Sequence, residues 1–210
     1  REARNTGRRA RGGARVSVAA APAQGVRAYG QVLRLPGARA FVAAGILARF
    51  PRATLSLGII LLVSAATGSF ASAGLVVAPL VIGMAVAAPL WSSRMDRHGQ
   101  ARVILVSLGC LVLAASALLA LVLTGAPFWT WLVAALVTGA ATPDLTSAVR
   151  ARWTVLAPPA HRTAALALET IADQMVFIAG PPAITAVAAA LDPAVAMLGS
   201  LGLGVIGGVW

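Results

Sequence analysis

Four charged residues stand inside long apolar stretches of the sequence. Arg49 and Arg52 lie three residues apart around Pro51, and Glu169 and Asp173 lie four residues apart. Residues at these spacings share one face of a helix. Charges in apolar segments are costly unless they are paired. They therefore indicate either a packing contact or a site that binds a proton or a cationic solute.

The depth of these residues in their segments follows from the helical rise of about 1.5 Å per residue. If both segments begin at the same side of a membrane, Arg49 lies roughly 16 Å and Asp173 roughly 15 Å from that side. Glu169 then lies at roughly 9 Å and Arg52 at roughly 21 Å. We therefore predict that Arg49 pairs with Asp173, and that all four side chains lie in the interior of a helical bundle.

Two interpretations of this charged group stay open. In the first, the ion pairs only fix the packing of the helices. In the second, they line a polar cavity in which a carboxyl group, in the first place that of Asp173, takes up a proton or a cationic solute. Burial favours the neutral form of a carboxyl group and a nearby arginine favours the charged form, so such a site can switch between two states. Two acids and two bases exceed what packing requires, which favours the second interpretation.

The composition indicates an all-α integral membrane protein. Hydrophobic residues make up 59% of the 210 residues and charged residues 11%, with a mean hydropathy of +0.87. Soluble domains carry about a quarter charged residues. Several apolar runs exceed the roughly 18 residues that predict a transmembrane helix. The single cysteine, Cys110, allows no disulfide within the chain, and no metal site is expected.

Six apolar segments follow a basic N-terminal region. Residues 1–27 are expected to form a disordered basic tail, and residues 28–37 a segment that lies on the membrane surface. Residues 38–210 are expected to form one membrane domain. We predict a six-transmembrane-helix bundle with spans near residues 38–63, 72–93, 103–123, 128–149, 163–191 and 194–210.

The arginines indicate the orientation in the membrane. All 17 basic residues are arginine, and the net charge is +11. Nine arginines precede residue 40, and the connectors 94–102 and 150–162 carry three each, whereas the connectors 64–73 and 124–127 carry no charge. Since basic residues favour the cytoplasmic side, this alternation predicts a cytoplasmic N-terminus, and the plasma membrane is the expected location. Basic residues distributed in this way do not form the patch expected of a nucleic-acid-binding surface.

The prolines suggest an internal duplication. Pro51 and Pro143 lie near the middle of the first and fourth segments, whereas Pro89 and Pro181 lie late in the second and fifth. Interrupted helices at matching places are typical of the inverted repeats of transporters. The sequence therefore predicts two related halves of three spans each.

A short motif lies between the second and third segments. In the run WSSRMDRHGQAR, Asp96, Arg97 and Gly99 form Asp-Arg-x-Gly, and Arg102 follows. Gly99 permits a tight turn with positive φ, and Asp96 is suited to cap a helix end and to pair with an arginine. The pattern resembles the signature Gly-x-Leu-Ala-Asp-Arg-x-Gly-Arg-Arg of the major facilitator superfamily. It departs from that signature at the leading glycine, at the leucine and at both final basic positions.

A second resemblance lies in the fifth segment. Gly180 and Pro181 resemble the Gly-Pro core of a motif found in the exporters of the same superfamily. The stretch from Glu169 to Pro181 and the run RLPGARAFVAAGILARFP also look similar to actinobacterial members. The resemblance covers residues 28–210 and implies the N-terminal six-helix half of a transporter, in which the first and fifth spans are neighbours and a second six-span half completes the pathway.

The resemblance implies a secondary active transporter that is not an enzyme and needs no cofactor. We expect proton-coupled efflux of a small hydrophobic or drug-like solute, with the loop at Asp96 helping to lock the cytoplasmic side. The expected partners are the solute, the proton, the lipid bilayer and the second half, in the same chain or in a partner; nucleic acid is not among them. The sequence contains no nucleotide-binding loop. The alternative is a non-transporting six-span scaffold or remnant whose basic tail binds anionic lipid.

Overall fold

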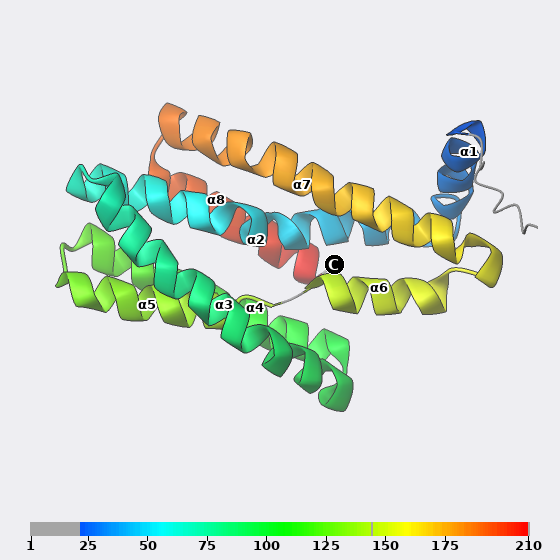
Figure 1. The fold of residues 1–210 in the computed structure, drawn as a ribbon, viewed down its shortest axis with the longest axis horizontal. Helices are drawn as coiled ribbons and strands as arrows, with labels where there is room; N and C mark the ends of the chain where they lie inside the picture. The colour runs from blue at the N-terminus through cyan, green and yellow to red at the C-terminus, as the bar shows by residue number, and fades with distance from the viewer. Residues whose placement is uncertain (1–21, 144, 210) are drawn as a thin grey trace, which may run out of the picture.

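The computed structural model describes residues 22–143 and 145–209 of the chain. This part is helical apart from short connections (Figure 1). The elements in chain order are α1 (Pro22–Val32), α2 (Ala38–Thr67), α3 (Phe70–His98), α4 (Gln100–Leu123), α5 (Phe128–Ala141), α6 (Leu145–Leu156), the 3-10 turn η1 (Pro159–His161), α7 (Arg162–Ala190) and α8 (Pro193–Val209).

Helices α2, α3, α4 and α7 are long and apolar enough to cross a membrane, by length and composition. Helices α5 and α8 are apolar but shorter. The first helix, α1, begins at Pro22, inside the range expected to be a disordered tail, and it ends at Val32. The remainder of the expected tail, residues 1–21, lies outside the described residues.

The fourth apolar segment is interrupted, whereas the sequence predicts one continuous span over residues 128–149. Helix α5 ends at Ala141, and Thr142 is extended, with φ −72° and ψ 117°. The cause is Pro143, because a proline ring disfavours helical geometry in the residue before it and supplies no backbone N–H. The chain resumes as the separate helix α6.

The long helices lie side by side along the long axis of the molecule and run alternately in opposite directions (Figure 1). Helix α2 packs against α7 and α8, and α5 packs against α3 and α4. A contact between α2 and α3 joins these two groups. The connection between α3 and α4 and the connection between α6 and α7 lie at the same end of the bundle (Figure 1), and these two connections carry arginines.

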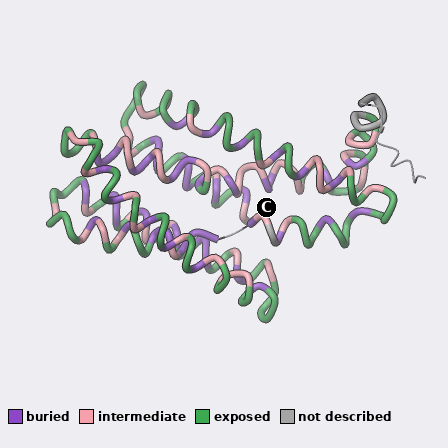
Figure 2. Tube along the Cα trace, in the orientation of Figure 1, coloured by how far each residue is buried: buried purple, intermediate pink, exposed green. Residues whose placement is uncertain are grey.

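Apolar side chains fill the interior and also cover much of the outer surface. The main core joins α2, α3, α4, α5 and α8, and a smaller cluster around Trp153 and Ala165 lies near α1. Buried residues follow the inner faces of the helices (Figure 2). Large hydrophobic residues such as Phe70, Leu113 and Ile178 are exposed on the outside. A surface of this kind suits contact with lipid rather than water.

Helices α3 and α5 approach each other closely through two glycines. A Cβ atom at Gly83 would overlap the carbonyl oxygen of Leu136, and a Cβ atom at Gly139 would overlap that of Leu80. Small residues allow helix backbones to meet in this way, and membrane helices depend on such packing because lipid provides no hydrophobic driving force between them.

Candidate functional site

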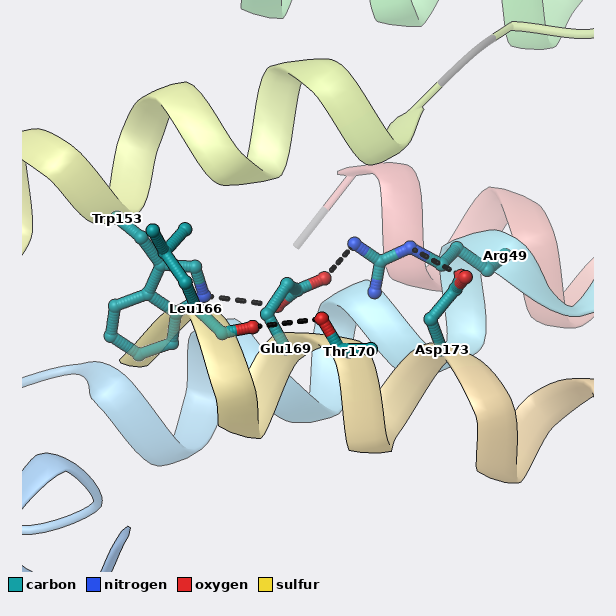
Figure 3. A network of polar contacts seen from close by, with 6 residues as sticks. All are labelled: Arg49, Trp153, Leu166, Glu169, Thr170 and Asp173. Carbon is teal, nitrogen blue, oxygen red and sulfur yellow. Dashed lines mark hydrogen bonds and ion pairs between the residues drawn. The ribbon is translucent and has the colours of Figure 1, made fainter. Parts of the chain in front are cut away.

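An ion pair lies inside the bundle where α2 passes α7. The Nη2 atom of Arg49 pairs with Oε1 of Glu169 (Figure 3). The two side chains are 3% and 2% exposed. Gly45, one turn before Arg49, leaves room for the guanidinium, since a Cβ there would lie 3.3 Å from Nη1. A buried ion pair of this kind is costly to break, because either partner alone would leave an uncompensated charge.

Asp173 lies one turn beyond Glu169 on α7. Its Oδ1 is 3.5 Å from Nε of Arg49, and its side chain is 21% exposed (Figure 3). Neither atom has a hydrogen-bond partner among the described residues, and this separation is long for a hydrogen bond. Arg49 therefore lies between two carboxyl groups, of which one is fully buried and tightly held and the other is partly accessible and loosely held.

Helices α2 and α7 begin at the same end of the bundle (Figure 1), as the comparison of the depths of Arg49 and Asp173 assumes. Arg49 lies as many residues after Ala38 as Asp173 lies after Arg162, the first residues of the two helices. The structure thus brings together three of the four charged residues that the sequence singles out: Arg49, Glu169 and Asp173.

A third helix reaches the same network through Trp153. Its indole Nε1 donates a hydrogen bond of 2.9 Å to Oε2 of Glu169 (Figure 3). The indole is buried and packs edge-to-face on Phe41, with ring centroids 5.2 Å apart. Both carboxylate oxygens of Glu169 are thereby satisfied, and α6 is tied to α2 and α7.

Sequence reasoning missed Trp153, because it assigned residues 150–162 to a loop. A signal was present in the residue type. A tryptophan that is buried usually needs an acceptor for its N–H, and a carboxyl group in a neighbouring apolar segment is the strongest acceptor available. The spacing of Val149, Trp153 and Leu156 also fits one face of a helix.

Arg52 does not join the network, which corrects the prediction that all four charges lie in the interior. Its side chain is exposed, and it lines a small pocket with Pro143 rather than facing α7. Positions three apart on a helix differ by about 60° in direction. Arg49 faces α7, so this rotation turns Arg52 towards the break between α5 and α6. The neighbouring Asp144 lies outside the described residues.

The loop motif forms the sharp connection between α3 and α4. Gly99 is the single residue between the two helices and has φ 85°, as the sequence predicts. Asp96, Arg97 and Arg102 are exposed, and no ion pair among the described residues involves them. Asp96 does not cap α4 either, because Gly99 occupies the cap position and no side chain bonds there. Asp96 lies within the last turn of α3, too early to reach the free N–H groups of the next helix.

The Gly-Pro pair of α7 lies at the contact with α2. Gly180 is buried, and a Cβ there would lie 2.9 Å from Cγ2 of Thr54. The hydroxyl of Thr54 also shares a hydrogen bond of 2.6 Å with that of Ser200 on α8. Helix α7 continues through Pro181 without interruption. Gly180 therefore contributes to the packing of α7 against α2, and Thr54 joins α2 to α8.

A groove of about 410 Å³ lies between α2, α4, α6 and α8. Its walls are mostly apolar and include Phe41, Ala48 and Leu105, together with Arg152. Gly45, which makes room for Arg49, also lines this groove. Its volume is in the range of ligand pockets. Within the described part of the chain, no group of three or more His, Cys, Asp or Glu could hold a metal ion.

Long apolar helices around a buried charged network define a helical membrane protein with a polar site in its interior. A sequence model of the Major Facilitator Superfamily matches residues 41–210, and the chain belongs to this family of membrane transporters. Members of the family sit in a lipid bilayer and bind small-molecule substrates. No curated protein and no solved structure matches the chain.

Proposed function

We propose that the protein is a proton-coupled carrier that exports a small, largely apolar solute, and that Asp173 is the group that takes up the proton. The observation that carries this proposal is the unequal sharing of Arg49. Glu169 is buried and has partners on both oxygens, whereas Asp173 is partly accessible and only loosely paired. A coupling group must exchange protons with water, and of the two acids only Asp173 is exposed enough to do so.

The coupling step follows from the position of Arg49. When Asp173 carries a proton, its attraction to the guanidinium is lost and Arg49 is held by Glu169 alone. When the proton leaves, Arg49 is again attracted by both acids. Because Arg49 belongs to α2 and both acids belong to α7, the protonation state of Asp173 alters the contact between these helices. Arg52 is exposed on another face of α2 and has no part in this step.

The chemistry of the solute is proposed from the groove between α2, α4, α6 and α8. Its apolar walls fit a hydrophobic or drug-like compound, and Gly45 connects the groove to the guanidinium of Arg49. Occupation of the groove is therefore expected to affect the ion network directly. The loop residues Asp96, Arg97, Gly99 and Arg102 are proposed to control closure of the cytoplasmic side, as the family resemblance implies.

We further propose six spans that form two inverted repeats, α2–α4 and α5–α8, in a plasma membrane with a cytoplasmic N-terminus. The packing supports the repeats, because α2 packs on α7 and α8 while α5 packs on α3 and α4. Exchanging the two halves converts one set of contacts into the other. A second six-span half, in the same chain or in a partner, is proposed to complete the pathway.

Transport by proteoliposomes with an imposed pH gradient tests the proposal. The wild-type protein is expected to move a fluorescent hydrophobic cation or dye against its gradient, and Asp173→Asn is expected to abolish this movement. Asp192→Asn is the matched control, because Asp192 is exposed in the connection between α7 and α8. Gradient-driven transport by Asp173→Asn would exclude Asp173 as the coupling group. Absence of any transport by the wild type would favour the non-transporting scaffold.

A further inference from the structure

A second groove lies between α3 and α4, at the end of the bundle that carries the arginine-rich connectors. Its volume is about 530 Å³. Residues of α3 line it at helical intervals of three and four, so they form one face of that helix. The groove is separate from the ion network and from the groove proposed for the solute. Its main lining residues are Leu90, Trp91, Arg94, His98, Arg102 and Val106.

The basic residues of this groove lie together at one end of it. Arg94 and His98 belong to the last turns of α3, and Arg102 belongs to the first turn of α4. Arg94 lies over the ring of Trp91, 5.7 Å from its centroid. Trp91 is itself fixed by a hydrogen bond of 2.7 Å from Nε1 to the carbonyl oxygen of Ala140. No described acidic side chain pairs with Arg94 or Arg102.

The other end of the groove is apolar. Leu90 and Val106 are exposed, and Ala87 continues the same wall. From Leu90 to His98 the groove extends about 12 Å along α3. It therefore changes from an apolar to a basic surface over a distance comparable to that between the acyl chains and the headgroup of a phospholipid. A soluble anion would use only the basic end.

We infer that this groove binds an anionic glycerophospholipid, with the phosphate between Arg94 and Arg102 and an acyl chain along Leu90 and Val106. Basic pockets between membrane helices recognise anionic headgroups by charge, and each basic residue near the lipid surface contributes roughly a fivefold gain in binding. The aromatic ring of Trp91 suits the headgroup level, where amphipathic rings collect. The inference rests on the position of the helices in a bilayer and is independent of transport.

Native mass spectrometry of the full protein, delipidated in detergent, provides the test. The protein is titrated with phosphatidylglycerol or with phosphatidylcholine of the same chains. The wild type is expected to retain phosphatidylglycerol preferentially, and Arg94→Gln/Arg102→Gln to bind it roughly 30-fold more weakly. Arg97→Gln/Arg150→Gln removes the same charge from exposed arginines outside the groove, and it is expected to bind phosphatidylglycerol as the wild type does.

If both double variants lost phosphatidylglycerol binding to the same extent, the lipid would be held by general charge attraction, and the inference would be overturned. Displacement of the lipid by inorganic phosphate would overturn it as well, because the site would then recognise the ion alone. A second measurement leaves the arginines unchanged. Phosphatidylglycerol with brominated chains is expected to quench the tryptophan fluorescence of the wild type more than that of Trp91→Phe. Brominated phosphatidylcholine is expected to quench the tryptophan fluorescence of both proteins equally. Equal quenching by the two lipids would contradict the assignment.

Discussion

At the scale of single residues, the unequal sharing of Arg49 gives the two acids different properties. Glu169 is enclosed and satisfied by Arg49 and Trp153, so its charge is part of the structure. Asp173 is partly exposed, and its Oδ1 lies 3.5 Å from Nε of Arg49, which is long for a hydrogen bond. Breaking a buried pair costs more than removing an exposed partner, because the remaining charge is stranded without water.

Glu169→Gln is therefore expected to destabilise the protein by about 3–5 kcal/mol, since Arg49 loses its buried charged partner and keeps only the looser contact with Asp173. Asp173→Asn removes a carboxylate from the same helix and is expected to cost no more than about 1 kcal/mol. Thermal unfolding in detergent measures both. A larger loss of stability in Asp173→Asn than in Glu169→Gln would show that Asp173, and not Glu169, is the tightly held partner of Arg49.

Trp153→Phe keeps an aromatic ring against Phe41 and removes only the indole donor. The expected cost is about 1–3 kcal/mol, because Oε2 of Glu169 loses its partner in a buried site. Thermal unfolding is again the measurement. Trp129→Phe is the control, as Trp129 is 65% exposed and should be insensitive. Equal stability of Trp153→Phe and the wild type would indicate that water replaces the indole.

The sequence predicts this site in part. The depth comparison predicts that Arg49 pairs with Asp173, and the family resemblance makes the two spans neighbours. In the structure Arg49 lies near Asp173 but pairs more tightly with Glu169, one turn earlier on α7. The position of Arg52 could not be predicted from its spacing. It points about 60° away from Arg49 around the axis of α2, and this difference is enough to move a side chain from the interior to another face of the helix. Trp153 could not be placed either, because its position depends on where the chain turns after Pro143, which is a tertiary feature.

At the scale of elements, the break in the fourth segment has a consequence for burial. Helix α5 has 14 residues and is about 21 Å long, shorter than a hydrocarbon core of about 30 Å. Non-helical backbone at membrane depth must be covered by protein or face a water-filled cavity. Thr142 and Pro143 are both buried, and the N–H of Thr142 bonds the carbonyl of Gly139. The protein therefore covers the described part of the break, Thr142 and Pro143.

Gly139→Ala is expected to destabilise the protein by about 1–3 kcal/mol, because the added methyl group meets the backbone of α3, which cannot move without displacing a helix. Gly109→Ala on α4 is the matched control, since nothing lies within 4 Å of its Cβ position. A gain of stability is expected there, from the better helix propensity of alanine. Equal unfolding temperatures for the two variants would contradict the close approach of α3 and α5.

Apolar periodicity and length predict the long helices well, and the connections at Gly68 and Gly99 fall where composition changes. The break could not be predicted from the presence of proline. Pro51, Pro79 and Pro181 lie inside continuous helices, whereas Pro143 ends one. Residue type alone therefore does not distinguish these prolines. The close contact of Gly139 with the backbone of α3, just before Pro143, is a tertiary feature that the sequence does not show.

At the scale of the whole molecule, the arginine-rich connectors lie at one end and the uncharged ones at the other (Figure 1). This asymmetry predicts which end faces the cytoplasm. With Cys110 replaced by serine, Thr67→Cys should react with an impermeant maleimide added to intact cells. Ala160→Cys should react only after the membrane is opened. Both positions are exposed, so a difference in labelling reports the side of the membrane.

The opposite labelling pattern would reverse the orientation and place the basic groove in the outer leaflet. Labelling of both positions from outside would contradict the odd number of crossings, namely α3, α4 and the α5–α6 segment, that the proposal places between Thr67 and Ala160. The positions are at opposite ends of the bundle, so access through the protein would not account for equal reactivity (Figure 1).

One arginine facing two carboxyl groups also has an electrical consequence. With both acids ionised, the network of Arg49, Glu169 and Asp173 carries one net negative elementary charge, and a single bound proton makes it neutral. In the carrier proposed above, reorientation with an uncharged solute would therefore move charge in one half of the cycle only. A full elementary charge crossing the membrane potential corresponds to about 2.3 kcal/mol per 100 mV. Voltage, as well as the proton gradient, would then set the direction of the cycle, through the half in which Asp173 is ionised.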